Sequence, residues 1–245
     1  MNLVNKEYHK RAKQLLETWE QREPSPTMDS IENDQLAGMI DHTVLKPDAS
    51  ISDVNKLCKE ALEFKFASVC VNPSHVERCV AILGDAVPVC TVVGFPLGAN
   101  HTDIKAEETK LAVAQGAREI DMVINMGLLK TANYQEVFDD IKAVRMACPE
   151  AELKVILETC LLSKQDIIIA CLLCREAGAD FVKTSTGFSS GGATAEDVNL
   201  MRFVVGEDLG VKASGGIRNR DDAIAMVSAG ANRLGASAGV SIVQG

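Results

Sequence analysis

Aromatic side chains are scarce in this sequence: Phe, Trp and Tyr make up only 4% of the 245 residues. The core of a chain this long must therefore be mainly aliphatic. Long apolar runs are missing as well, and none approaches the roughly 20 residues of a membrane-spanning helix. We therefore expect no membrane as a partner.

Positive charge is in deficit. Lys and Arg number 25 against 34 Asp and Glu, which gives a net charge of -9. Such a chain is repelled by nucleic-acid phosphates and by anionic lipid surfaces. We therefore expect no nucleic acid as a partner, and a small anion would have to be bound by local backbone groups and a few charges.

Histidine is rare, and its four copies have no ligand-like spacing, so we predict no metal centre. The 8 cysteines do not predict disulfides, because no signal peptide is recognisable and several lie in apolar runs such as 68–71 and 88–91. Cys171 and Cys174 have CxxC spacing, but their apolar surroundings favour a buried helix over a metal or redox site. Reduced, buried cysteines indicate a cytoplasmic protein.

What the sequence does contain is a repeated strand–loop–helix pattern from residue 31 onward. Short β-rich apolar runs span 39–43, 67–71, 87–94, 119–125, 153–159, 180–184, 211–214 and 233–236. Helical patterns lie between them, for example 103–115, 134–147 and 221–229, and glycines that suit left-handed helix ends follow several of them. Strands alternating with helices predict parallel βαβ units.

Eight such units predict one α/β domain, a (β/α)8 TIM barrel over residues 31–245. A doubly wound open sheet is the alternative, although it usually has fewer strands. Residues 1–30 differ, because 7–22 is polar with a narrow stripe of Leu15, Leu16 and Trp19, followed by a Pro-containing breaker at 23–27. We expect an additional N-terminal helix outside the barrel.

Alternation along the strands predicts which side chains face the barrel axis. In run 119–125, Ile120, Met122 and Ile124 face the helices, whereas Asp121 faces inward. The same alternation turns further charged side chains inward: Lys154, Glu158, Lys183 and Lys212. Charges in a barrel interior are costly unless they pair or perform chemistry.

Lys183 and Lys212 lie on neighbouring strands, which are about 4.8 Å apart. A lysine must be neutral to attack a carbonyl, and burial or a second cation lowers its pKa. We therefore predict Lys183 as a Schiff-base nucleophile, Lys212 as its electrostatic activator and Asp121 as a proton acceptor and donor. The alternative is a buried structural ion-pair network of these lysines with Asp121 or Glu158.

Glycine-rich loops follow the last three strands. They hold Gly187, then Gly215, Gly216 and Arg218, and finally Gly235 and Ser237. In TIM barrels the loops after the seventh and eighth strands often bind phosphate through backbone N–H groups. A single Gly-Gly pair can equally be an ordinary tight turn, but three such loops on the expected strands predict a phosphate site.

From about Ile40 to Gly245 the sequence resembles the deoxyribose-phosphate aldolases. The resemblance rests on stretches 41–47 (DHTVLKP), 70–73 (CVNP), 93–98 (VGFPLG), 119–125 (EIDMVIN), 181–187 (FVKTSTG) and 211–218 (VKASGGIR). It implies a class I aldolase without cofactor or metal that reversibly cleaves 2-deoxy-D-ribose 5-phosphate to D-glyceraldehyde 3-phosphate and acetaldehyde. Lys183 matches the Schiff-base lysine, and Asp121 with Lys212 matches the proton-transfer pair.

The resemblance also implies roles for the loops and for the first strands. Phosphate would contact Gly187, Gly215, Gly216, Arg218, Gly235 and Ser237, and the sugar pocket would be lined by Asp41, Thr43 and Cys70. Cys70 is equally expected as a small core residue. A homo-oligomer, dimer or tetramer, is implied too.

This sequence departs from some members of the family in two places. Phe188 stands where some members carry a phosphate-binding lysine, and the only tyrosines, Tyr8 and Tyr134, are far from a C-terminal tail that could reach the active site. Two rival functions remain: an aldolase or transaldolase-like enzyme for another sugar phosphate, and a non-catalytic sugar-phosphate-binding barrel. The second would not need two inward lysines beside an inward aspartate.

Overall fold

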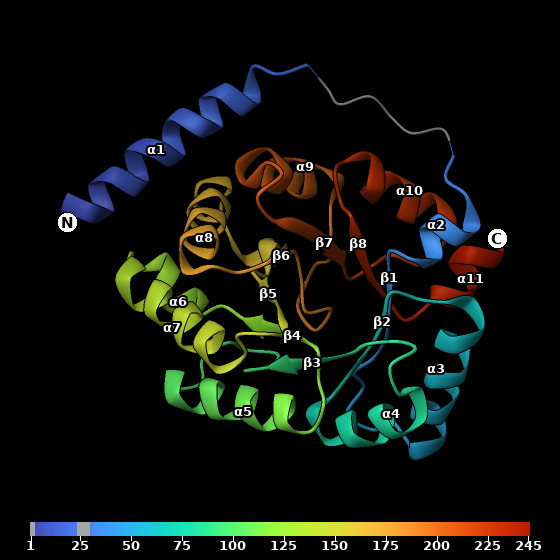
Figure 1. The fold of residues 1–245 in the computed structure, drawn as a ribbon. Helices are drawn as coiled ribbons and strands as arrows, with labels where there is room; N and C mark the ends of the chain where they lie inside the picture. The colour runs from blue at the N-terminus through green and yellow to red at the C-terminus, as the bar shows by residue number, and fades with distance from the viewer. Residues whose placement is uncertain (1–2, 24–29) are drawn as a thin grey trace.

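The computed structural model describes residues 3–23 and 30–245. At its centre lies a closed barrel of parallel strands in chain order, β1 to β8 (Figure 1). The strands are β1 (Ile40–Val44), β2 (Ser68–Val71), β3 (Val89–Val93), β4 (Glu119–Val123), β5 (Glu152–Ile156), β6 (Phe181–Lys183), β7 (Gly210–Ser214) and β8 (Arg233–Ala236). The predicted TIM barrel is confirmed, and the open sheet is excluded.

Helices surround this barrel (Figure 1). They are α2 (Asn33–Ala37), α3 (Ile51–Phe64), α4 (Val76–Leu83), α5 (Thr102–Ala114), α6 (Met126–Lys130), α7 (Tyr134–Ala147), α8 (Lys164–Ala177), α9 (Ala195–Val205), α10 (Arg220–Ser228) and α11 (Gly239–Gln244), with 3-10 turns η1 (Pro73–His75) and η2 (Thr159–Leu161). Across the described part of the chain, none of the helices combines the length and the apolar character needed to span a bilayer.

Local sequence signals set the ends of several helices. Ser50 caps α3 and Ser163 caps α8, each in a capping box completed by an aspartate three residues later. Gly178 ends α8 in the left-handed conformation with φ 84°. The fifth strand is shorter than the predicted run 153–159, because Glu158 adopts φ 58° and breaks the extended backbone.

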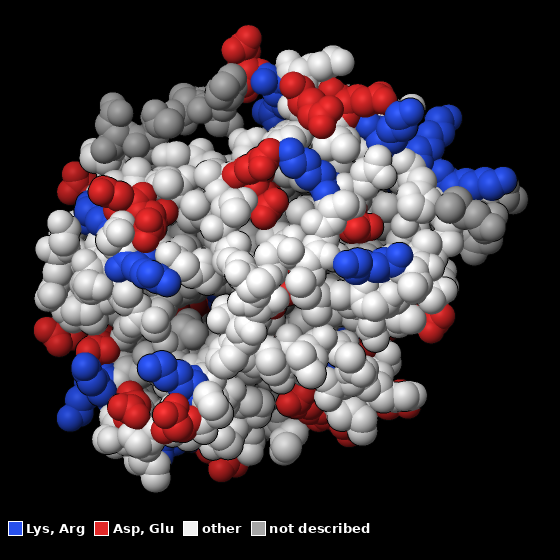
Figure 2. Space-filling model, turned by 180° about the vertical axis from the view of Figure 1, so that it is seen from behind, with Lys and Arg blue, Asp and Glu red and all other residues white. Residues whose placement is uncertain are grey.

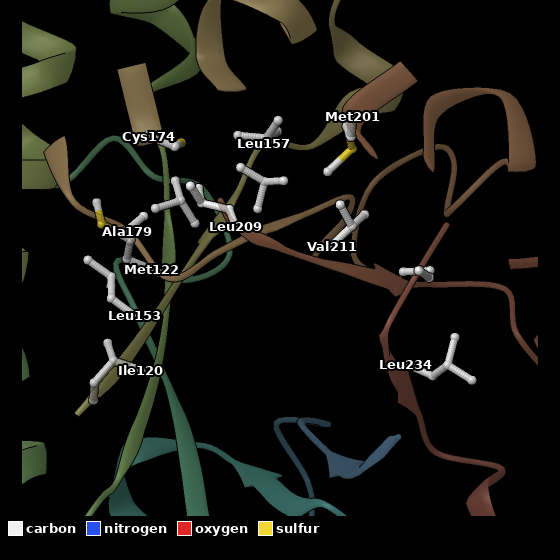
Figure 3. Close-up of a cluster of buried hydrophobic side chains, with 14 of the residues drawn as sticks. Ile120, Met122, Leu153, Leu157, Cys174, Ala179, Met201, Leu209, Val211 and Leu234 are labelled. Atoms are coloured by element: carbon white, nitrogen blue, oxygen red, sulfur yellow. The ribbon is translucent and has the colours of Figure 1, made fainter. Parts of the chain in front are cut away.

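The main hydrophobic core lies between the strands and the helices (Figure 3). Ile120 and Met122 point from β4 into this layer, as alternation predicted. A much smaller apolar cluster of Leu45, Cys70, Cys90 and Val92 lies inside the barrel. Charged side chains such as Asp121, Lys154 and Lys212 are buried in the same interior and make it the place for a polar site.

Helix α1 (Leu3–Glu20) lies outside the ring of helices and packs on α8 and α9 (Figure 1). Ala12 is fully buried in this contact, and the Trp19 indole donates to Asn199 at 2.9 Å. The cover explains why α8 is buried over a continuous stretch, 167–174, which includes the free cysteines Cys171 and Cys174. Most of the predicted breaker, residues 24–27, lies outside the described residues.

Candidate active site

Lys183, Lys212 and Asp121 meet inside the barrel. Lys183 and Lys212 are partners in the β6–β7 register, so their side chains enter the barrel at the same level. Asp121 reaches them from β4, and its Oδ2 accepts from Nζ of Lys183 at 2.7 Å and from Nζ of Lys212 at 2.7 Å. The structure thus brings together the three residues that the sequence singled out for chemistry.

The charges of this group are set by burial and by neighbouring ions. Burial favours the neutral form of Lys212, but the carboxylates of Asp121 and Asp41 outweigh it and raise the pKa of Lys212. Burial likewise opposes ionisation of Asp121, yet Lys154, Lys183 and Lys212 hold the pKa of Asp121 well below its usual range. At neutral pH, Lys212 is therefore an ammonium and Asp121 a carboxylate.

The two lysines differ in their surroundings. Lys212 is fully buried and forms ion pairs with both Asp41 and Asp121. Lys183 lines the large pocket at the end of the barrel, and Asp121 is its ion-pair partner among the described residues. A substrate in the pocket therefore meets Lys183, while Lys212 contacts it only through the carboxylate that they share.

A second layer of charges lies beneath this group. Lys154 pairs with Glu119 at 2.5 Å and with Oδ1 of Asp121 at 3.2 Å. Arg233 pairs with Asp41 at 2.8 Å and with Glu119 at 3.3 Å. Sequence alternation placed Lys154 inside the barrel but gave it no role, and Arg233 and Glu119 were missed, because ion partners from distant strands leave no local signal.

The pocket has a volume of about 790 Å³. Its wall contains most of the residues predicted to bind substrate: Thr43, Gly187, Gly215, Gly216, Arg218, Gly235 and Ser237. It also contains the exposed lysines Lys46 and Lys56, which the sequence did not single out. Asp48, Asp53 and Glu60 line the same pocket, and Lys56 pairs with Glu60 at 3.6 Å. The part of the wall suited to an anionic ligand is therefore the side formed by the glycine loops and Arg218.

The glycines have distinct structural reasons to be where they are. Gly187 and Gly216 both have φ 84° and face open space, and their N–H groups donate no hydrogen bond within the described residues. Gly235 is needed for close packing, because a Cβ there would lie 2.9 Å from Cβ of Ser214 and 3.1 Å from Cε of Lys212. Two pocket-lining peptide N–H groups thus have no acceptor among the described residues, and Lys212 gains the space that its side chain occupies.

Two predicted pocket residues lie elsewhere. Asp41 does not line the pocket but pairs with Lys212 and Arg233 below it. Cys70 belongs to the small apolar cluster inside the barrel, in line with its alternative role as a core residue. Both face inward as expected, but their depth in the barrel keeps them away from the pocket wall.

Phe188 does line the pocket, and its ring meets that of Phe95 edge to face at 5.3 Å between centroids. The two tyrosines lie outside the barrel, where Tyr8 of α1 packs edge to face on Tyr134 of α7. No tyrosine among the described residues therefore reaches the pocket.

Among the described residues, the only group of three possible metal ligands whose donor atoms lie close together is Cys70, Cys90 and Asp121. Asp121 already pairs with three lysine ammonium groups, which compete with a cation for its oxygens. The carboxylate is therefore committed to the lysines.

Comparison with known proteins matches residues 36–245 to the DeoC/LacD family aldolases. The deoxyribose-phosphate aldolase of Clostridium perfringens is 58% identical over 217 residues, which cover 88% of this chain and 97% of the relative. That of Exiguobacterium sibiricum is 58% identical over 212 residues, or 86% and 96% of the two chains.

Solved structures of deoxyribose-phosphate aldolases match this fold as well. A putative deoxyribose-phosphate aldolase from Coccidioides immitis matches with a TM-score of 0.92 and 46% identity, covering 100% of this chain and 97% of the other. A deoxyribose-phosphate aldolase from Aeropyrum pernix, described as tetrameric, matches with a TM-score of 0.80 and 33% identity, covering 95% and 97%. Both likenesses extend over the whole barrel.

Proposed function

Because the chain belongs to the DeoC/LacD aldolase family, we propose that it reversibly cleaves 2-deoxy-D-ribose 5-phosphate to D-glyceraldehyde 3-phosphate and acetaldehyde, a step of deoxyribonucleoside catabolism. One structural observation carries the mechanism: the pocket lysine, Lys183, shares a single buried carboxylate with a second, charged lysine. A barrel that only bound sugar phosphates would have no use for this arrangement.

Cleavage begins when the neutral Nζ of Lys183 attacks the aldehyde carbon of the open-chain sugar. Loss of water gives a protonated imine, which accepts the electron pair of the breaking bond between the second and third carbons. The hydroxyl on the third carbon loses its proton as glyceraldehyde 3-phosphate departs. The enamine left on Lys183 is protonated on carbon, and water then releases acetaldehyde and the free amine.

Asp121 and Lys212 handle the protons of these steps. Asp121 Oδ2 lies 2.7 Å from both amino nitrogens, so it can accept a proton from Lys183 and exchange one with Lys212. Asp121 and Asp41 keep Lys212 charged, so Lys212 can return a proton to the carboxylate that it shares with Lys183. We assign Lys183 as nucleophile and Asp121 with Lys212 as the proton-transfer pair.

The phosphate group binds at the glycine loops. The open N–H groups of Gly187 and Gly216, with the wall formed by Gly215, Gly235, Ser237 and Arg218, offer donors and one exposed cation. This is a local site, consistent with the net charge of -9, and acidic and basic side chains are interspersed over the face in Figure 2. We expect no nucleic acid as a partner.

Borohydride trapping tests the proposal. The protein is incubated with 2-deoxyribose 5-phosphate or acetaldehyde, reduced, and digested for mass spectrometry, with Lys183→Leu as the matched control. A reduced adduct on Lys183 that is absent from the control supports the imine. An adduct on Lys212 would reverse the two lysine roles, and the absence of any adduct on folded protein would reject the Schiff-base mechanism in favour of a binding barrel. Product analysis separates this activity from cleavage of a longer sugar phosphate.

We also propose a cytoplasmic homo-oligomer, dimer or tetramer, with residues 1–30 as an extension of a barrel domain of residues 31–245. Exposed Ile104 and Leu111 on α5 and Met146 on α7 support association. Light scattering coupled to gel filtration gives the mass, and a single 26.3 kDa species would reject the oligomer.

A further inference from the structure

Glu158 has a left-handed backbone, a buried carboxyl group and no cation partner among the described residues, and stability alone favours none of these. It lies two residues after the end of β5, and its backbone is left-handed with φ 58°, a conformation that residues other than glycine rarely adopt. Its carboxyl group is buried, with only 2% of the residue exposed. Strained, buried polar residues persist where the surrounding structure holds them for a purpose.

The carboxylate of Glu158 has no cation partner within the described residues, unlike Asp121 or Asp41 nearby. Instead it accepts from one residue, Thr186. The Thr186 N–H lies 3.2 Å from Oε1, and the Thr186 hydroxyl donates to Oε2. A sulfur contact from Cys160, at 4.0 Å, is the remaining interaction.

Thr186 links its hydrogen bonds with Glu158 to the rest of the loop after β6. Its Oγ1 also accepts from the N–H of Phe188 at 3.0 Å, so the backbone is held on both sides of Gly187. The same loop rests on the segment after Glu158, because a Cβ on Gly191 would lie 2.8 Å from Cβ of Cys160. The peptide of Gly187 thus lies between residues whose hydrogen bonds lead back to Glu158.

We propose that Glu158 is a positioning residue for the phosphate group: through Thr186 it holds the Gly187 N–H in the direction of the bound anion. That the bound phosphate belongs to 2-deoxyribose 5-phosphate rests on the proposed function. The positioning itself applies to any phosphate group in the pocket. Glu158 does not line the pocket, so it acts without touching substrate.

Electrostatics and positioning make opposite predictions. A carboxylate behind an anion-binding loop repels phosphate, so if charge dominated, its removal would tighten binding. If positioning dominates, removing the acceptor atoms weakens binding, while an uncharged side chain that still accepts from Thr186 preserves it. Glu158→Ala and Glu158→Gln separate these two effects.

The experiment measures kcat and KM of both variants with 2-deoxyribose 5-phosphate and with unphosphorylated 2-deoxyribose, and the affinity for inorganic phosphate by calorimetry. In Glu158→Ala we expect KM for the phosphorylated sugar and Kd for inorganic phosphate to rise about tenfold, equivalent to about 1.4 kcal/mol. We expect kcat/KM for unphosphorylated deoxyribose to stay within about twofold, and Glu158→Gln to restore the native values for phosphate.

Three results would overturn the proposal. Equal losses on both sugars in Glu158→Ala would indicate a general structural role. Tighter phosphate binding in both variants would show that charge dominates, and native behaviour of Glu158→Ala would show that the loop needs no support. If Glu158→Ala does not fold, Thr186→Val removes the hydroxyl that links Glu158 to Phe188 and is expected to weaken phosphate binding in the same selective way.

Failure of the proposed function is recognisable separately. Glu196→Gln, on the exposed surface of α9, is the matched control for a lost carboxylate away from the loop. A parent protein that cleaves neither sugar but binds inorganic phosphate would refute the aldolase assignment, and the calorimetric comparison would still decide the role of Glu158.

Discussion

Removal of Asp140 should destabilise the protein by an amount that depends on pH in a defined direction. Lys105 of α5 and Asp140 of α7 form an ion pair at 2.6 Å with side-chain exposures of 0% and 2%. Nζ of Lys105 also donates to the carbonyl of Val123 at 2.9 Å, at the end of the strand that carries Asp121. Asp140→Asn leaves the Lys105 ammonium buried without its ion-pair partner.

The expected cost follows from two limits. Breaking one side of a buried pair typically costs about 3–5 kcal/mol. Lys105 can escape part of this by losing its proton, and deprotonating a lysine with the ordinary pKa near 10.4 costs about 4.6 kcal/mol at pH 7. We therefore expect a loss of about 4 kcal/mol, or roughly 10 °C in Tm for a chain of this size.

The pH dependence gives the sharper test. In the native chain burial lowers the pKa of Lys105, although Asp140 opposes the effect. In Asp140→Asn the larger part of this opposition is gone, with Glu108 remaining, so the folded-state pKa of Lys105 falls further below the unfolded value. Between those two pKa values the unfolded chain binds more protons, so the variant regains stability as pH rises, by up to about 1.4 kcal/mol per unit.

Urea unfolding of parent and variant at pH 7 and pH 9.5 measures both effects. The deficit of Asp140→Asn should shrink clearly at the higher pH. Lys105→Met with Asp140→Leu, which removes both charges, should lie within about 2 kcal/mol of the parent. A deficit below about 1 kcal/mol at pH 7, or one that is the same at both pH values, would refute the reasoning.

Three further predictions concern the site and the extension. Lys212→Met removes one of the lysines that share Asp121, and with it the proposed proton relay, so kcat should fall about 10²–10⁴-fold in a steady-state assay. Borohydride should still trap some adduct on Lys183, and an unchanged kcat would contradict the proton-transfer role. Burial opposes ionisation of Asp41, but Lys212 and other cations lower its pKa to about 2, so it contributes about 2 kcal/mol of stability above pH 4 that is lost as pH falls toward 2. Urea midpoints at pH 4 and pH 2 should therefore differ less in Asp41→Asn than in the parent, and equal differences would be evidence against the assignment. Ala12→Asp places a charge in the buried face of α1 and should cost about 2 kcal/mol and speed amide exchange in α8 with activity retained; unchanged exchange would show that α1 does not protect that helix.

Local sequence patterns predict much of the fold. Alternation within a strand depends only on the pleat, so it correctly separated Ile120 and Met122, which face the helices, from Asp121, which faces the axis. Glycines after helices and the regular succession of apolar runs marked the units of the barrel. The placement of Lys183 and Lys212 on consecutive strands likewise followed from the order of those runs, since neighbours in sequence are neighbours in a closed parallel barrel.

Depth and partners could not be obtained in this way. Alternation tells which side a residue faces but not how far along the axis it lies, so Asp41 was expected in the pocket although it pairs with Lys212 and Arg233 below it. The pKa of Lys212 could not be obtained from its neighbouring lysine alone either, because Asp121 and Asp41 approach from other strands and raise it.

The sequence by itself determined the barrel and the inward direction of Asp121, Lys183 and Lys212, the three residues of the proposed chemistry. Only the tertiary structure decided which lysine faces the pocket, which carboxylates neutralise the other, and that Glu158 supports a loop rather than pairing with a lysine. The physical reason is the distance along the chain over which each interaction acts. Periodicity and caps act over a few residues, whereas an ion pair or hydrogen bond across the barrel depends on the register and shear of every strand between its two partners.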